Sequence, residues 1–163
     1  DMLVFARGEL PLTDRITPNA LMQTLQAAAL THVQDLPIRW QCDSHAGELL
    51  CNRDTLVGSL LNLIENAIQA SDGNVRLKVH CYTRDNTLRL CVSDSGSGID
   101  PVVLERLGEP FFTTKVTGTG LGLTVVKAVA RAHQGELRLR SRVGRGTCAQ
   151  VILPLFSAVQ GAE

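Results

Sequence analysis

Apolar positions recur with helical spacing in three stretches of the chain. Thr17 and Pro18 are typical of a helix N-cap and first helical residue, and the apolar repeat after them predicts a helix to about Val33. A second and longer helix is predicted from Asp54 to Ala70. The same spacing returns from Leu121 to about His133. We therefore expect about three amphipathic helices.

Alternating apolar and polar residues predict strands in the remaining stretches. The clearest pair runs from Val75 to Tyr82 and from Thr87 to Ser93, with the turn-forming Asp85 and Asn86 between them, as expected of a hairpin. Shorter strands are predicted at residues 38–42, 48–51, 136–142 and 147–153. Strands mixed with helices in irregular order favour an α+β two-layer sandwich, in which about three helices cover one face of a mixed sheet of about five strands.

Two segments interrupt these patterns. Residues 1–12 include Gly8 and Pro11, which stop a helix, and we expect a domain boundary there. From Asp94 to Gly120 the chain is rich in Gly, Pro, Ser and Thr, and loops of this length are usually functional or disordered. One domain is therefore expected over residues 13–156, followed by a flexible tail at 157–163. Because the first residue is Asp1 and not a methionine, we expect the chain to be a piece of a longer protein.

Composition narrows the classes of partner. The 163 residues, 44% of them hydrophobic, suffice for one sizeable core. Sixteen basic and sixteen acidic side chains cancel, so we expect no nucleic-acid partner, although a local patch stays open. Five cysteines without a C-x-x-C pair indicate neither a disulfide framework nor a zinc site, and fit a reducing, cytoplasmic setting. No apolar run approaches the ~20 residues of a membrane span, so we expect no membrane contact in this segment.

One face of the predicted helix at 54–70 carries an unusual polar stripe. Asn62, Glu65, Asn66 and Gln69 recur at spacings of three and four. A solvated face is one interpretation, but such faces normally carry Lys, Glu and Arg, and asparagine disfavours a helix by roughly half a kcal/mol. The other interpretation is that two carboxamides and a carboxylate in one turn act as hard oxygen ligands for Mg²⁺ on a phosphate chain.

Two glycine-rich motifs lie at the ends of the long loop. Asp94-Ser95-Gly96-Ser97-Gly98 follows a strand, where a buried aspartate can accept a hydrogen bond from the exocyclic amine of adenine, although an ordinary Asp-Gly turn would look the same. The motif from Gly118 to Leu123 precedes a helix, whose N-terminus can cradle phosphate, although a hinge is an equal alternative. A Gly-Lys-Ser/Thr ending and a strand directly before these glycines are both missing, which argues against a P-loop or Rossmann site.

A fourth motif, Gly144-Arg145-Gly146-Thr147, completes an ordered set. Together the motifs resemble those of the gyrase, chaperone, histidine kinase and mismatch-repair ATPase superfamily. Residues 61–67 resemble its N box, Asp94 to Gly98 the first glycine box, residues 109–115 the F box, and Gly118 to Gly122 the second glycine box. The F box is typical of the kinases, and its Phe-Phe-Thr-Thr-Lys wording is similar to nitrogen-regulation and flagellar-regulation sensor kinases. The resemblance covers Thr13 to Leu155.

The resemblance implies a Bergerat-fold sandwich with a long ATP lid at about residues 100–119. It implies Asn66 as a Mg²⁺ ligand, Asn62 as its partner near the phosphates, and Asp94 as the residue that recognises adenine, supported by Thr147. Ile99 and Leu123 are implied apolar contacts to the base. The full implied nucleotide-binding set is Asn62, Asn66, Gln69, Asp94, Gly96, Gly98, Ile99, Lys115, Gly118, Thr119, Gly120, Leu121, Gly122, Leu123 and Thr147.

The implied catalytic residues are Asn62, Glu65, Asn66 and Lys115. Glu65 either orients the acceptor of the phosphoryl group or is a simple exposed glutamate on the helix. Gln69 stands where many family members have Lys or Arg, so positive charge at the phosphates must come from Lys115, Mg²⁺ or a neighbouring domain.

The implied function is to bind Mg²⁺-ATP and to transfer its γ-phosphate to a histidine on the kinase's own dimerisation domain, for relay to the receiver domain of a response regulator, expected to be a transcriptional activator. None of the four histidines, His32, His45, His80 and His133, has the His-Glu-x-x-x-Pro setting of a phosphoacceptor. We therefore expect the acceptor before Asp1, with residues 1–12 as the end of the dimerisation domain. His133, at a predicted helix end, is interpreted as a favourable contact with the helix dipole. We expect the isolated domain to be a monomer and the full kinase a homodimer.

Three other functions stay open. An ATPase of the gyrase or chaperone kind would need a carboxylate to activate water, and Asn62 stands where those relatives have a glutamate, which disfavours hydrolysis. A free-standing serine kinase is disfavoured by the apparent end of a dimerisation domain at residues 1–12. A nucleotide-sensing module without transfer finds no support in the intact motifs.

Overall fold

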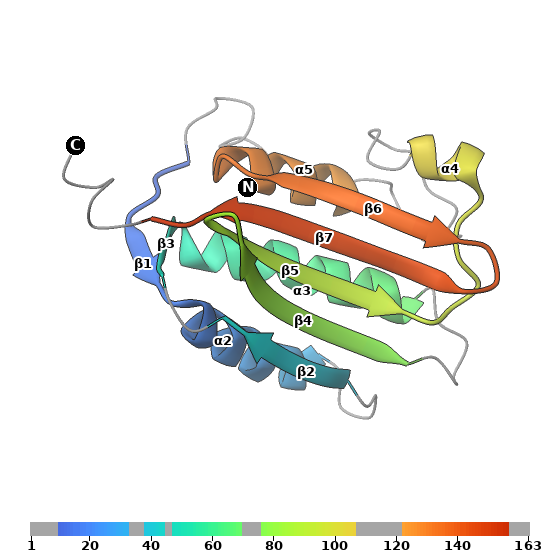
Figure 1. Cartoon of the computed structure of the whole chain (residues 1–163), viewed down its shortest axis with the longest axis horizontal. Coiled ribbons are helices and arrows are strands. Elements are labelled where there is room, and N and C mark those ends of the chain that lie inside the picture. Colours follow the sequence, from blue (N-terminus) through green and yellow to red (C-terminus); the bar gives the residue numbers. More distant parts are fainter. Residues whose placement is uncertain (1–9, 33–37, 45–46, 70–75, 107–121, 157–163) are drawn as a thin grey trace.

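The centre of the fold is a mixed five-stranded sheet. The computed structural model describes residues 10–32, 38–44, 47–69, 76–106 and 122–156 (Figure 1). In spatial order the strands are β2 (Ile38–Asp43), β4 (Leu77–Arg84), β5 (Thr87–Asp94), β7 (Gly146–Pro154) and β6 (Glu136–Arg142). Strands β2 and β4 are parallel, and the other neighbours are antiparallel. The predicted mixed sheet is confirmed.

Three helices lie against one face of this sheet: α2 (Pro18–His32), α3 (Arg53–Gln69) and α5 (Gly122–Ala132) (Figure 1). Thr17 caps α2 as predicted, because its Oγ1 accepts the Ala20 N–H at 3.2 Å. The inner side of α3 is buried and packs in one core with β5; its buried residues are Leu56, Val57, Ser59, Leu60, Leu63, Ile64 and Ala67. The predicted α+β sandwich is therefore confirmed. None of the described helices is long and apolar enough to cross a membrane.

Asp85 and Asn86 form the tight turn between β4 and β5. Their φ angles are 53° and 58°, in the left-handed region that a type I′ hairpin turn requires. Arg84 pairs with Thr87 directly across this turn. The predicted hairpin is confirmed, because Asp and Asn tolerate this backbone conformation better than other residues except glycine.

Two short elements were not predicted. Strand β1 (Asp14–Ile16) pairs with β3 (Leu49–Cys51) in a separate two-stranded sheet, so the strand predicted at residues 48–51 does not join the main sheet. Helix α4 (Pro101–Arg106) lies within the predicted loop and is capped by Asp100, whose Oδ1 accepts the Val102 N–H at 2.9 Å. The loop prediction is wrong over α4, since an element of three or six residues is too short to show a period. The predicted lid residues 107–119 lie outside the described residues.

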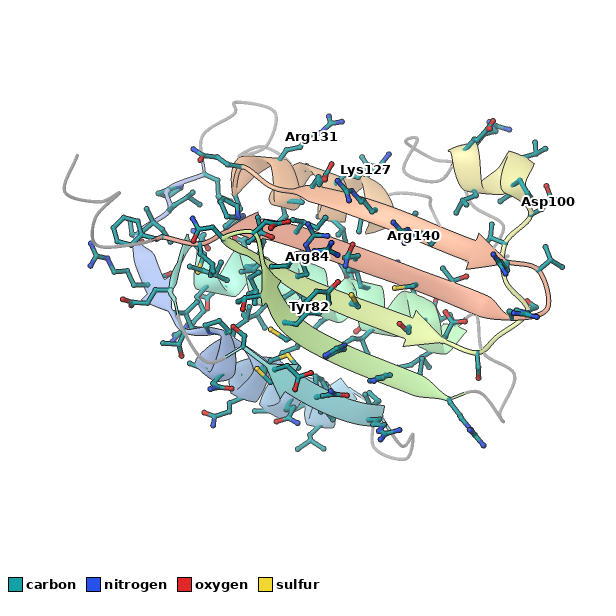
Figure 2. All side chains as sticks on the ribbon, viewed as in Figure 1. Tyr82, Arg84, Asp100, Lys127, Arg131 and Arg140 are labelled. Atoms are coloured by element: carbon teal, nitrogen blue, oxygen red, sulfur yellow. The ribbon has the colours of Figure 1, made fainter. Side chains whose placement is uncertain are left out.

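The two faces of the sheet differ in chemistry. Alternate residues of a strand point to opposite faces, and in β4 the buried Val79 and Cys81 face the helices while His80 and Tyr82 face the other way. We call this second face the outer face; its residues include Arg39, Lys78, His80, Tyr82, Arg89, Cys91, Arg138, Arg140, Cys148 and Gln150. Figure 2 shows the side chains of Tyr82 and Arg140 on the strands of this face. A chain without net charge therefore carries a locally basic surface.

Candidate nucleotide-binding site

The predicted site residues come from elements that meet at one end of the sheet. Figure 1 shows the C-terminal ends of α3, β5 and β6 and the beginning of β7 at this end. Asp94 is the last residue of β5 and pairs with Thr147 of β7 on one side and with Leu77 of β4 on the other. The first glycine motif and the Gly144–Thr147 motif are therefore adjacent in space, although about fifty residues separate them in the sequence.

The Asp94 carboxylate has a fixed orientation. Its Oδ1 accepts the Gly96 N–H at 2.9 Å, an aspartate turn that holds the side chain at the end of β5. The side chain is half-buried. The next residue, Ser95, anchors the chain on the opposite side, because its N–H donates to the Arg76 carbonyl at 3.1 Å and its Oγ accepts the Arg76 N–H at 2.9 Å. These bonds place the carboxylate before any ligand binds.

Glycine is required where the loop after β5 approaches the β6–β7 hairpin. Gly98 has a φ of +79°, and a Cβ there would lie 2.1 Å from the Arg142 carbonyl oxygen. Gly146 has a φ of +115°, and a Cβ there would lie 2.0 Å from the Asp94 carbonyl oxygen. Both positions combine a left-handed backbone with direct backbone contact, so no other residue fits without displacement. The glycines at 98 and 146 thus hold the loop against the hairpin.

Ser141 joins the two parts of the site, and the sequence did not indicate it. Its Oγ accepts the Ile99 N–H at 2.7 Å, donates to the Gly146 carbonyl at 3.1 Å, and lies 2.8 Å from Thr147 Oγ1. Since the one hydroxyl proton of Ser141 goes to Gly146, the Thr147 hydroxyl is the donor in the third bond. Thr147 pairs with Asp94 in the sheet register, and its hydroxyl bonds to Ser141.

The polar stripe of α3 runs along about two turns of the helix, beside its buried side. Asn62, Glu65 and Asn66 are half-buried and Gln69 is exposed. Half-burial of two asparagines on a helix favours the ligand interpretation over a fully solvated face. Carboxamide oxygens are suitable donors for Mg²⁺ bound to phosphates, a cation that proteins usually hold with few side chains of their own. The residues present therefore fit Mg²⁺-ATP, with Asn66 and Asn62 as the side chains that would hold the cation.

The structure describes only the end of the second glycine motif, at the beginning of helix α5. Gly122 is its first residue, and Leu123 is half-buried and packs against the core. Ile99, the other predicted base contact, is half-buried. The remaining predicted residues of this group, namely Lys115, Gly118, Thr119, Gly120 and Leu121, lie outside the described residues.

His133 fastens α5 to α3, the two helices that carry these motifs. Its side chain is buried, Nδ1 lies 2.8 Å from the Val129 carbonyl, and Nε2 accepts the Asn52 N–H at 3.1 Å. Because Nε2 accepts a bond, the ring proton must be on Nδ1, and the imidazole is neutral. Burial lowers the pKa of His133, against the opposing effect of its bond to Val129. The contact with the helix end is present, because Nδ1 bonds to the Val129 carbonyl of α5, but a buried and neutral ring makes it.

Residues 51–157 match the model of one protein family, described as histidine kinase-, DNA gyrase B- and HSP90-like ATPases. The chain belongs to this family. The description of this family as ATPases implies that its members bind ATP. The chain is 72% identical over 158 residues to the sensor protein kinase FleS of Pseudomonas aeruginosa, an alignment that covers 97% of this chain and 39% of FleS. It therefore spans less than half the length of this relative.

Solved structures show the same fold for this ATPase domain. The catalytic domain of the histidine kinase ThkA matches with a TM-score of 0.76 and 25% identity, over 86% of this chain and 94% of that one. Full-length ShkA in complex with AMPPNP matches with a TM-score of 0.78 and 23% identity, over 96% of this chain and 35% of that one, and at this identity it shows the fold alone. The resemblance to histidine kinase catalytic domains, inferred from the motifs, is confirmed.

Proposed function

We propose that this ATPase domain binds Mg²⁺-ATP beside the end of β5 and positions the γ-phosphate for transfer to a histidine on the dimerisation domain of the same kinase. The similarity to a sensor protein kinase supports phosphoryl transfer, and membership of the ATPase family supports ATP binding. ShkA carries AMPPNP in this fold. The observation on which the proposal depends is the Asp94 carboxylate, oriented by Gly96 where the loop, β6 and β7 meet.

The Asp94 carboxylate would identify the base. It accepts a hydrogen bond from the exocyclic amine of adenine, and a bond of this charged kind contributes roughly 1.5–3 kcal/mol. Guanine presents a carbonyl oxygen at the corresponding position, which would face the carboxylate without a proton between them. Ile99 and Leu123 would supply apolar contact to the ring. The site should therefore prefer ATP to GTP.

The phosphates would lie between α3 and the start of α5. Asn66 and Asn62 would hold the cation through their carboxamide oxygens, and Mg²⁺ would supply positive charge against the phosphates. The N–H groups at the beginning of α5, with Gly118, Thr119, Gly120 and Leu121 before it, bind phosphate oxygens, and Lys115 adds positive charge. Gln69 is exposed on α3 and carries no charge, so its side-chain amide can offer the phosphates only a neutral N–H hydrogen bond.

Phosphoryl transfer then needs positioning more than covalent help from the protein. A neutral imidazole attacks the γ-phosphorus, and the bond to the ADP oxygen breaks. Glu65, half-buried on the same turn as Asn62 and Asn66, is suited to orient this acceptor. The acceptor belongs to the dimerisation domain, of which residues 1–12 are the proposed end. Residues 13–156 form the catalytic domain, residues 157–163 its tail, and a response regulator receiver domain takes the phosphoryl group onward.

The test is the chemistry of the transferred label. The longer protein that contains this chain is incubated with γ-labelled ATP and Mg²⁺, and the label on protein is assayed for stability in acid and alkali. Phosphohistidine is acid-labile and alkali-stable, which is the expected result. Acid-stable label would indicate serine or threonine transfer, and phosphate release without labelled protein would indicate a hydrolase, so either outcome contradicts the proposal.

Matched variants of asparagine show whether the α3 stripe is responsible. Asn62→Ala and Asn66→Ala should each abolish most of the labelling. Asn19→Ala, at an exposed position of α2, removes the same side chain elsewhere and should leave labelling unchanged. Equal labelling in all three variants would refute the role assigned to α3.

A further inference from the structure

The outer face of the sheet brings two cysteines together at the strands that carry the site. On adjacent strands, Ser93 of β5 pairs with Cys148 of β7, and Cys91 pairs with Gln150. Cys91 and Cys148 are therefore diagonal neighbours on one face, and each thiol affects the pKa of the other. Neither takes part in a disulfide. The sequence shows two cysteines 57 positions apart, and only the register makes them a pair.

The surroundings make one of these thiols acidic. The main cause that lowers the pKa of Cys148 is a hydrogen bond from the Cys91 thiol. The Ser93 hydroxyl and the positive charge of Arg140, which lies directly opposite on β6, lower it further. Burial and the negative charge of Asp94 oppose the shift. Cys91 keeps its proton, because its bond to Cys148 and its burial raise its pKa.

A polar network fixes the donor thiol. Gln150 Nε2 lies 3.3 Å from Cys91 Sγ and 2.9 Å from the Tyr82 hydroxyl oxygen, so β4, β5 and β7 together hold Cys91 in place. Figure 2 labels Tyr82, which lies on β4, and Arg140, which lies on β6. Cys148 itself is half-buried and reaches the surface.

Cys42 of β2 and Cys81 of β4 form a second thiol pair, directly opposite each other in the register, but on the helix-facing side of the sheet. Burial raises the pKa of Cys51 to about 11, and burial also raises the pKa of Cys81. Cys42 is partly exposed like Cys148, but it lies on β2 at the sheet edge, on the helix-facing side. Cys42 therefore serves as the control for a partly exposed cysteine that lies on a different strand and on the other face of the sheet.

We infer that Cys148 is a thiol modification site that takes low-molecular-weight disulfides and forms a mixed disulfide with one half of them. The Cys148 thiolate attacks one sulfur of the small disulfide, the S–S bond breaks, and the other half leaves as a thiolate that takes up a proton from water. Cys148 is oxidised and the leaving half is reduced, so electrons balance without a further reagent. Arg140 stabilises the attacking thiolate, and Cys91 directs its S–H to the same sulfur.

The position of Cys148 links this reaction to the nucleotide, and this second part depends on the proposed function. Cys148 directly follows Thr147, and its partner Ser93 directly precedes Asp94. A bulky group on the Cys148 sulfur removes the contacts of that sulfur with Ser93 and Cys91. These contacts lie one position along the strands from the pair formed by Asp94 and Thr147. Coupling between adjacent sites typically changes affinity by at least about fivefold. Modified protein should therefore bind ATP about fivefold more weakly than reduced protein.

The test uses the reduced chain and oxidised glutathione near neutral pH, with the modified residue located by peptide mass mapping. Because Arg140 lies directly opposite Cys148 and stabilises its thiolate, Cys148 should be modified about tenfold faster than Cys42. Cys148→Ser should remove the fast phase, and Cys42→Ser should leave it intact. Cys91→Ser and Arg140→Gln should each slow it, and circular dichroism checks that every variant is folded. Equal rates at Cys42 and Cys148 would overturn the inference.

ATP titration before and after modification tests the link to the nucleotide. A loss of affinity of about fivefold, reversed by a reducing agent, supports it, and unchanged affinity with Cys148 fully modified contradicts it. If the reduced chain itself fails to bind ATP, the proposed function fails, while the rates of glutathione addition still decide whether Cys148 is the modification site.

Discussion

The contact of Gly98 with the β6–β7 hairpin allows a prediction with an internal control. Gly98 and Gly144 both have left-handed backbones, with φ angles of +79° and +83°. A Cβ at Gly98 would lie 2.1 Å from the Arg142 carbonyl oxygen, whereas a Cβ at Gly144 would meet nothing within 4 Å. Gly98→Ala and Gly144→Ala therefore share the backbone cost and differ only in the clash.

The magnitude follows from the bonds that the clash would break. Placing alanine in the left-handed region costs about 1 kcal/mol in either variant. Relieving the clash at Gly98 moves the loop away from the hairpin and loses the Ile99 N–H bond to Ser141 Oγ and the Gly144 N–H bond to the Ser97 carbonyl, both 2.7 Å. At about 1 kcal/mol per bond, Gly98→Ala should cost about 3 kcal/mol against about 1 kcal/mol for Gly144→Ala.

Thermal unfolding measures the difference. In a domain of this size, 1 kcal/mol lowers the melting temperature by about 2–4 °C. Gly98→Ala should therefore melt about 6–12 °C below the unaltered chain, and Gly144→Ala only about 2–4 °C below it. Gly98→Ala should also weaken ATP binding, because the loop that orients Asp94 is displaced. Equal losses of melting temperature in the two variants would refute the close approach as the reason for glycine at position 98.

Three further predictions concern other contacts. Burial lowers the pKa of His133, so on acidification the imidazole is protonated in the unfolded state before it is protonated in the folded state. The free energy of unfolding should therefore be highest above about pH 6.5 and should fall as the pH drops below that value. Urea titrations should show a smaller fall in His133→Gln, and an identical fall would contradict the buried neutral ring. Ser141→Ala leaves the Ile99 N–H without its partner and should cost about 1–3 kcal/mol in the same assay; a change near zero would show that the serine does not join loop and hairpin. Asn66→Ala should weaken ATP binding about tenfold or more in Mg²⁺ and change it little in a chelator, as measured by calorimetry; equal losses in both would argue against a metal ligand.

The long regular elements were predictable from the sequence, and the reasons are physical. Helix α3 runs from Arg53 to Gln69, long enough for its apolar period to show, and the β4–β5 hairpin combines clear alternation with a turn that suits Asp85 and Asn86. Strand β1 and helix α4 were missed because three and six residues hold less than two periods.

The site was predictable where a motif is contiguous, and not where it depends on register. Asp94 and Gly98 are in one glycine motif, so their role could be expected before the fold was known. Ser141 has no motif, and its bond to Ile99 joins positions 42 residues apart in the sequence. The pairing of Cys91 with Cys148 likewise arises only from the alignment of β5 with β7. Neighbours across a sheet cannot be read from either strand alone.

The most direct test of the central claim is a calorimetric titration of the chain with ATP and with GTP, repeated on Asp94→Asn and on Asp85→Asn. Asp85 is exposed in the β4–β5 turn, where asparagine also fits the left-handed backbone, so the second variant controls for loss of charge. ATP should bind more tightly than GTP by about tenfold or more; Asp94→Asn should lose this preference, and Asp85→Asn should keep it. Equal affinity for the two nucleotides, or a preference that survives in Asp94→Asn, would contradict recognition of adenine by Asp94.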